Sequence, residues 1–149
     1  MTSQLNVDTI VDKAGSSGPS LPNTTTIKIG NTSTNVSDGG AVTQNTVQGL
    51  AKMWIQFDGT GTVGTRDSFN RGGLTDNGTG NYTVTYTNNM NNNDFSVTVS
   101  MNSEYTSGGV GIYSGVYACN TADCRVSGRR YNANADSDFV CITVHGDLA

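Results

Sequence analysis

From Lys52 onward, apolar and polar residues alternate along several short segments of the chain. This period of two is typical of strands that bury one face and expose the other. The clearest segments are 52–57, 82–86, 95–101, 110–118 and 139–145. Two weaker segments, 62–69 and 124–131, bring the expected total to about seven strands, at a spacing typical of β-sandwiches and barrels.

Turn-forming residues separate these segments. Asp58-Gly59, Asn77-Gly78 and Gly108-Gly109 are turn dipeptides, and 88–93 is a polar run that tolerates left-handed backbone. The one candidate for helical structure is a turn or two at 43–51. We therefore expect an all-β fold in which residues 51–149 form an antiparallel β-sandwich or jelly-roll-like module. Four apolar residues of the 110–118 segment are expected to line one side of its strand: Val110, Ile112, Val116 and Ala118.

Residues 1–50 have a different pattern. Flexible stretches such as 14–20 and 38–40 separate apolar residues that are too few to close a core of their own. We expect an extended arm that serves anchoring and oligomerisation. Its strand-like apolar residues should become buried against copies of this chain or against another protein, and they are Leu5, Val7, Ile10, Ile27 and Ile29.

The composition excludes several classes of protein. Thr, Gly, Asn and Ser supply nearly half of the 149 residues, and only 13% of residues are charged. The formal net charge of −4 argues against a nucleic-acid partner, which would require a basic surface. No apolar run is long enough for a membrane helix. The odd number of cysteines, 3, fits a protein made in a reducing compartment.

Few residues suggest catalysis. Asp136 and Asp138 could form a carboxylate pair of the kind that glycosidases use, but in a polar segment solvated aspartates are the simpler interpretation. His145 is the only histidine, so a Ser or Cys nucleophile would depend on it alone. We expect no catalytic residue and hence no enzyme.

Metal binding is also not expected. Cys119, Cys124, Cys141 and His145 are the four Cys or His side chains, which is the number a zinc site needs. The last two are about 13 Å apart along a strand, which is too far for one ion. A disulfide between Cys119 and Cys124 is geometrically easier than a zinc site, but free thiols are the favoured interpretation.

Two further polar groupings have weak functional signals. The 132–138 segment carries oxygen-bearing side chains at alternate positions, as a calcium loop does, but Ser137 and Thr143 replace the Gly and Glu that such a loop requires. Arg125, Arg129 and Arg130 could recognise an anion, although charges that keep a strand edge soluble are the favoured reading. We expect neither a metal nor a cofactor.

Several segments resemble a known class of protein. Leu5-Asn-Val-Asp-Thr-Ile-Val-Asp12 resembles the N-terminal signature of short virion appendage proteins of marine tailed bacteriophages. Segments 54–62, 66–70 and 75–84 resemble a β-module of phage tail-fibre and head-fibre-like proteins. The resemblance covers residues 1–20 and 50–87. It implies a structural virion protein, assembled in the bacterial cytoplasm as a homotrimer, whose arm binds other virion proteins.

Three functions remain open at this stage: a tail fibre that contributes to host attachment, a capsid-decorating or head-fibre protein, and a carbohydrate-active enzyme using Asp136 or Asp138. For the first, we expect a host cell-surface glycan as partner, and neither nucleic acid nor membrane. Recognition is expected in loops far from the arm, at 88–94, 103–109 and 120–123, unless these are ordinary solvated turns. The candidate contact residues are Asn91, Asn93, Tyr105, Asn120 and Asp123.

Overall fold

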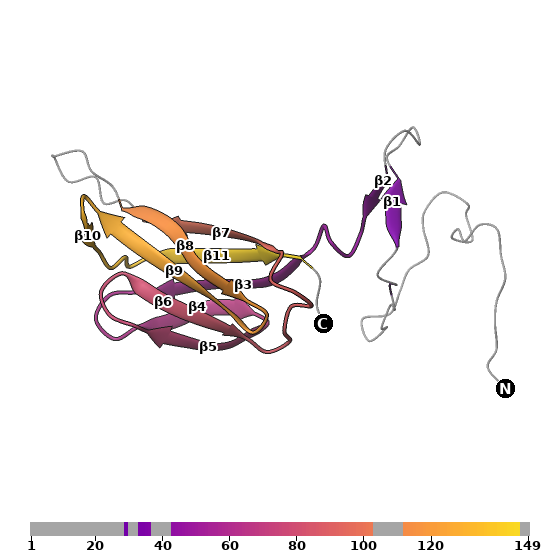
Figure 1. The fold of residues 1–149 in the computed structure, drawn as a ribbon. Helices are drawn as coiled ribbons and strands as arrows, with labels where there is room; N and C mark the ends of the chain where they lie inside the picture. The colour runs from indigo at the N-terminus through magenta and orange to yellow at the C-terminus, as the bar shows by residue number, and fades with distance from the viewer. Residues whose placement is uncertain (1–28, 30–32, 37–42, 103–111, 147–149) are drawn as a thin grey trace, which may run out of the picture.

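The described part of residues 51–146 forms two antiparallel β-sheets that pack face to face (Figure 1), and a separate two-stranded sheet precedes them in the chain. The computed structural model describes residues 29, 33–36, 43–102 and 112–146. These described residues form strands and turns without a helix. The expected all-β sandwich is thereby confirmed.

The first sheet has four strands in the order β4-β3-β11-β7. Their bounds are Gly64–Phe69 for β4, Ala51–Asp58 for β3, Val140–His145 for β11 and Ser96–Met101 for β7. The central strands β3 and β11 come from opposite ends of the sandwich sequence. The sheet therefore closes only when the last strand of the chain pairs with the first strand of the sandwich.

The second sheet has five strands. β5 (Arg71–Asp76) pairs with β6 (Asn81–Tyr86), and β6 pairs with β9 (Asp123–Arg130). β9 also pairs with β8 (Tyr113–Asn120), and the short β10 (Ala133–Asn134) continues the sheet beside the last two residues of β9.

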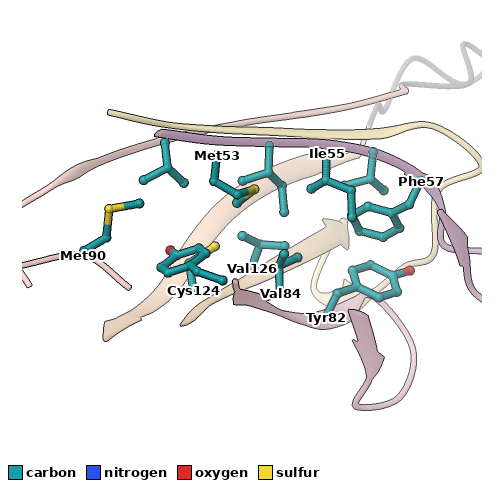
Figure 2. Close-up of a cluster of buried hydrophobic side chains, with 12 residues drawn as sticks. Met53, Ile55, Phe57, Tyr82, Val84, Met90, Cys124 and Val126 are labelled. Atoms are coloured by element: carbon teal, nitrogen blue, oxygen red, sulfur yellow. The ribbon is translucent and has the colours of Figure 1, made fainter. Parts of the chain in front are cut away.

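Side chains from both sheets form one core (Figure 2). Across the four-stranded sheet, directly opposed residues form three apolar rows: Phe57 with Val140 and Met101, Ile55 with Ile142 and Val99, and Met53 with Val144 and Val97. Such cross-strand pairs are the main source of sheet stabilisation. The second sheet contributes Tyr82, Val84, Tyr86, Cys124 and Val126. The rings of Phe57 and Tyr82 meet edge to face between the sheets, with centroids 5.1 Å apart.

Asn70 forms a corner at which the chain leaves one sheet and enters the other. It is the single residue between β4 and β5, and its φ of 56° lies in the left-handed region that Asn tolerates better than most residues. Its Nδ2 donates to the backbone oxygens of Lys52 (2.9 Å) and Asn88 (3.1 Å). Its Oδ1 accepts from the Asn88 N–H at 2.8 Å. One side chain thus fixes the corner to β3 and to the loop after β6.

Within the sandwich, the strand count differs from the sequence-based expectation in two places. β5 and β10 are not predicted by alternation, because β5 contains Gly72 and Gly73 and β10 spans only 2 residues. Alternation is visible only where side chains of both kinds are present for several residues. The predicted segment 62–69 corresponds to β4.

The prediction of a helical turn or two at 43–51 is wrong. Thr43–Asn45 is strand β2, which pairs with β1 (Thr34–Val36), and turns then connect it to β3. The Gly49 N–H donates to the Asn45 oxygen, but the chain enters β3 two residues later. A single hydrogen-bonded turn is too short to propagate as a helix.

The prediction for 110–118 is wrong for one residue. Val116 is 43% exposed, whereas Ile112 and Ala118 are partly buried and Val110 lies outside the described residues. β8 is an edge strand, and a register shift between Val116 and Ala118 interrupts its alternation. Such bulges are common at sheet edges and rotate side chains away from the face that alternation predicts.

Candidate functional site

The strand directions define two ends of the sandwich. β3 begins at Ala51, whose register partner His145 also pairs with Ser96 at the start of β7. Residues 1–50 therefore join at this end, together with the loop 87–95. The turn at 121–122 lies there too, because the Met90 N–H donates to the Thr121 oxygen at 2.8 Å. The opposite, distal end carries the connections 59–63, 77–80 and 131–139 (Figure 1).

Two of the predicted recognition loops lie at the end where the arm joins. Segments 88–94 and 120–123 are both there, so the expectation that they lie far from the arm is wrong. Strand β5 is the reason. Consecutive antiparallel strands run in opposite directions, so one strand that the alternation did not predict moves these loops to the other end. Their role as contact loops stays a prediction.

At the distal end, the 135–139 segment is attached to both sheets. The Gly59 N–H donates to the Ser137 oxygen at 2.8 Å. The buried Ser137 hydroxyl donates to the Phe139 oxygen at 2.9 Å and accepts from the Asn102 N–H at 3.2 Å. The segment therefore has a defined shape although it contains no long strand.

Asp136 is held by two donors from β6 and the turn before it. Its Oδ1 accepts from the Gly80 N–H at 2.6 Å and from the Tyr82 hydroxyl at 2.8 Å. Burial, followed by the hydrogen bond to this carboxylate, raises the pKa of Tyr82 above its ordinary value of 10.0. Tyr82 therefore remains a neutral donor, and one oxygen of Asp136 is fixed in place.

Two hollows adjoin this segment. The first, of about 210 Å³, is lined by Thr60, Asn102, Ile112, Arg130, Ala135, Asp136, Ser137 and Asp138. The second, of about 490 Å³, is lined by Arg66, Ser100, Met101, Asn102, Asp138 and Phe139. Asn102 and Asp138 line both, and the Asn102 Nδ2 donates to the Asp138 Oδ1 at 3.0 Å. We call the two hollows together the distal groove.

The distal groove presents several kinds of polar group. Within the described part of the chain, the buried Nε of Arg130 has no hydrogen-bond partner. At the rim, Arg66 forms an ion pair of 3.3 Å with Asp58, and hydrogen bonds from Thr60 lower the pKa of the Asp58 carboxyl. Phe139 is 39% exposed and adds an apolar surface. Donors, acceptors and an aromatic side chain therefore converge on one concave surface.

The sequence indicates some of the residues of this groove but not how they come together. Asp136 and Asp138 are exposed, as the solvated reading expected, yet Asp136 also accepts two hydrogen bonds from residues 54 or more positions away. Alternate polar positions in 132–138 were the available signal. The hydrogen bonds of this segment with Gly80, Tyr82 and Asn102 join residues 35 or more positions apart, which no local pattern contains.

The other predicted contact residues are not brought together into one site. Asn91 and Asn93 are exposed in the loop after β6, whereas Asn120 and Asp123 bond to each other across the β8–β9 turn at 2.9 Å. Tyr105 lies outside the described residues.

The arm residues are largely outside the structural description. Leu5, Val7, Ile10 and Ile27 lie among residues that the structure does not describe. Ile29 is described and is 44% exposed. Burial of the arm in an assembly stays a prediction.

The three arginines are divided between two surfaces. Arg125 stacks over the Tyr117 ring at 4.7 Å and donates to Asn81, and Arg129 donates to the Asn132 oxygen. Arg130 instead lines the distal groove. Adjacent residues of a strand point to opposite faces, so the three cannot form a single patch.

Within the described residues, the histidine and the two aspartates are not brought together. His145 lies at the end where the arm joins, at the opposite end of β11 from Asp136 and Asp138. In the described ranges, no three His, Cys, Asp or Glu side chains are grouped closely enough to hold a metal ion. The four potential zinc ligands are accordingly dispersed, with Cys119 and Cys124 on one hairpin and Cys141 and His145 on β11.

Comparisons with other proteins do not assign a family. None of the family models, curated proteins or solved structures that were compared with this chain matches it. In the part of the chain that the structure describes, no helix is long and apolar enough to cross a membrane.

Proposed function

We propose that this protein is a structural component of a tailed-bacteriophage virion, attached through residues 1–50, whose sandwich contributes to host attachment. The observation that carries the proposal is that the attachment point of residues 1–50 and the distal groove lie at opposite ends of the sandwich. Residues 1–50 join the sandwich beside His145, and the distal groove lies at the other end of the strands. A module held at one end presents the other end to a target. The resemblance of segments 5–12, 54–62, 66–70 and 75–84 to appendage proteins supports the same assignment.

A cell-surface glycan is the ligand class that suits the distal groove. Asp136 and Asp138 offer acceptors for sugar hydroxyls, and Asn102 and Arg130 offer donors. The ring of Phe139 provides a surface against which the C–H face of a pyranose can pack. Concave sites with a few convergent polar groups and an apolar wall are typical of small-ligand binding.

Homotrimer formation through the arm is part of the proposal. Each groove is small, and a site of this size binds a short saccharide weakly. A trimer carries three grooves, and a virion carries many trimers. The effective concentration of binding sites at the cell surface therefore rises. Sedimentation equilibrium of the full chain tests this part, and a monomer of 15.6 kDa at micromolar concentration contradicts it.

Labelling of the C-terminus on intact virions tests the location. We expect electron microscopy to place the label on tail fibres. Label over the capsid shell would instead support the decorating or head-fibre function, which the arm also permits. Label on neither would refute a virion role.

Substitutions in the distal groove test attachment. Asp138→Ala and Arg130→Ala each remove a charged hydrogen-bonding group, and such bonds contribute about 1.5–3 kcal/mol. We expect adsorption of variant virions to host cells to fall about tenfold or more. Asn93→Ala lies in the candidate contact loop at the other end and tests that competing position; it should adsorb like wild type if the groove is the binding site.

The same variants must first be shown to fold. Circular dichroism and a thermal melt of each purified protein provide that check. Normal adsorption by folded Asp138→Ala and Arg130→Ala would contradict recognition in the groove. Loss of adsorption by Asn93→Ala alone would instead place the host-binding site in the loop after β6.

A further inference from the structure

Two of the three cysteines are directly opposed in neighbouring strands. Cys119, near the end of β8, is the register partner of Cys124, near the start of β9. The hairpin that joins them turns at residues 121–122, between the partners Asn120 and Asp123. Opposed residues on antiparallel strands point to the same face, so the two thiols lie on one side of the sheet.

The position of this pair beside the turn determines its backbone geometry. In a hairpin with two turn residues, the pair next to the turn exchanges backbone hydrogen bonds, and the following pair does not. Cys119 and Cys124 are that following pair. Non-hydrogen-bonded pairs have Cα atoms about 4.5 Å apart, within the range of about 4.4–6.8 Å that disulfides span.

The third cysteine has no such neighbour. Cys141 lies on β11 in the other sheet, where its register partners are Gln56 and Ser100. Its strand neighbours Val140 and Ile142 point into the core, so Cys141 points away from it. Cys124 is completely buried within that core (Figure 2). Only one pairing of the three thiols is therefore compatible with the fold.

We propose that Cys119 and Cys124 form a disulfide bond when the folded protein meets a low-molecular-weight disulfide such as oxidised glutathione. This inference does not depend on the proposed function. The bond ties the edge strand β8 to β9 beside the turn.

The reaction is a two-step thiol–disulfide exchange. The Cys119 thiol loses its proton to solvent, and its sulfur attacks one sulfur of oxidised glutathione, which forms a mixed disulfide and releases one glutathione thiolate. Cys124 then loses its proton, and its sulfur attacks the Cys119 sulfur and releases the second. Two electrons pass from the protein to glutathione, and the two protons end on the released glutathione thiols.

Burial makes the exchange slow at neutral pH. Cys119 is the accessible member of the pair, since it is partly exposed and Cys124 is not. Burial and then Asp123 raise the pKa of Cys119, and burial raises the pKa of Cys124 to about 11. Because the thiolate is the attacking species, the exchange should accelerate as the pH rises.

The test is a thiol count after exposure of the folded full chain to oxidised glutathione at about pH 8.5. The protein is then unfolded, alkylated and measured by mass spectrometry. We expect the number of reactive thiols to fall from 3 to one, assigned to Cys141 by peptide mapping. The unalkylated protein should be lighter by two hydrogen atoms. Retention of all thiols, or a glutathione adduct that persists on Cys119, would overturn the proposal.

Two single variants separate this pairing from any other. Cys141→Ser should still form the disulfide and retain no reactive thiol. Cys119→Ser should keep both of its remaining thiols under the same conditions, and a disulfide between Cys124 and Cys141 in it would overturn the proposal. Cys119→Ala provides a second version of this variant, and circular dichroism before oxidation confirms that each folds.

Discussion

The corner at Asn70 offers the sharpest test of how the sandwich is held together. We consider two substitutions, Asn70→Ala and Asn70→Gly. Both remove the side-chain hydrogen bonds to Lys52 and Asn88. They differ in backbone preference, because Gly adopts a positive φ readily and Ala does not. The pair therefore separates the contribution of the hydrogen bonds from that of the left-handed backbone.

The magnitudes follow from the contacts. A hydrogen bond contributes about 0.5–1.5 kcal/mol net. Only the bond to the Lys52 oxygen is partly buried, so water replaces part of the two bonds to Asn88. We expect Asn70→Gly to cost about 2 kcal/mol. Ala at a φ of 56° adds about 1 kcal/mol of backbone strain, so Asn70→Ala should cost about 3 kcal/mol.

Urea unfolding followed by circular dichroism measures both values. With a denaturant slope of about 1.5 kcal/mol per molar, the midpoint should fall by about 2 M for Asn70→Ala. Asn91→Ala, an exposed Asn in the neighbouring loop, should change the midpoint by less than about 0.3 M. If Asn70→Gly is less stable than Asn70→Ala, the left-handed corner is not the constraint. If Asn70→Ala lowers the free energy of unfolding by less than about 1 kcal/mol, the side-chain hydrogen bonds of Asn70 do not constrain the corner either.

Three further outcomes are expected. Gly80→Ala should cost about 3 kcal/mol in urea unfolding, because a Cβ would lie 2.5 Å from the Gly128 oxygen, whereas Gly78→Ala, with open space, should cost only the backbone strain. Equal losses would contradict the steric argument. Since the pKa of Tyr82 is raised on folding, its contribution to stability is complete below about pH 10 and is lost as the pH rises further. Tyr82→Phe should lower the free energy of unfolding by about 1–3 kcal/mol at pH 7. Above about pH 10, the variant should lose less stability with rising pH than the wild type does, and an equal loss in both proteins would refute this. Residues 51–149 alone should melt cooperatively, and a broad transition would place the domain boundary elsewhere.

Alternation predicted the core because it is a local property. Met53, Ile55 and Phe57 are buried, as the period of two requires, and so are the corresponding residues of β6 and β11. A strand with one buried face must place every second side chain in the core, whatever its partners are. The residues that pack between the sheets could therefore be assigned before the sheets were known.

The alternation pattern does not predict strand order or the end of the sandwich at which each loop lies. β5 has glycines in place of alternating side chains, and one strand that alternation did not predict reversed the end at which 88–94 and 120–123 lie. The pairing of β3 with β11 joins residues that are far apart in the chain. Such choices depend on how two complete faces fit together, which is a property of the whole chain.

The chain's own sequence determined an all-β sandwich and the inward-facing residues of its main strands. Only the tertiary structure decided that Asp136 lies against Gly80 and Tyr82, that Asp138 pairs with Asn102, and that Cys119 opposes Cys124. The physical reason is the range of the interactions. Burial patterns repeat every second residue along a strand, whereas a groove is built where hydrogen bonds join loops whose positions are set by the pairing of distant strands.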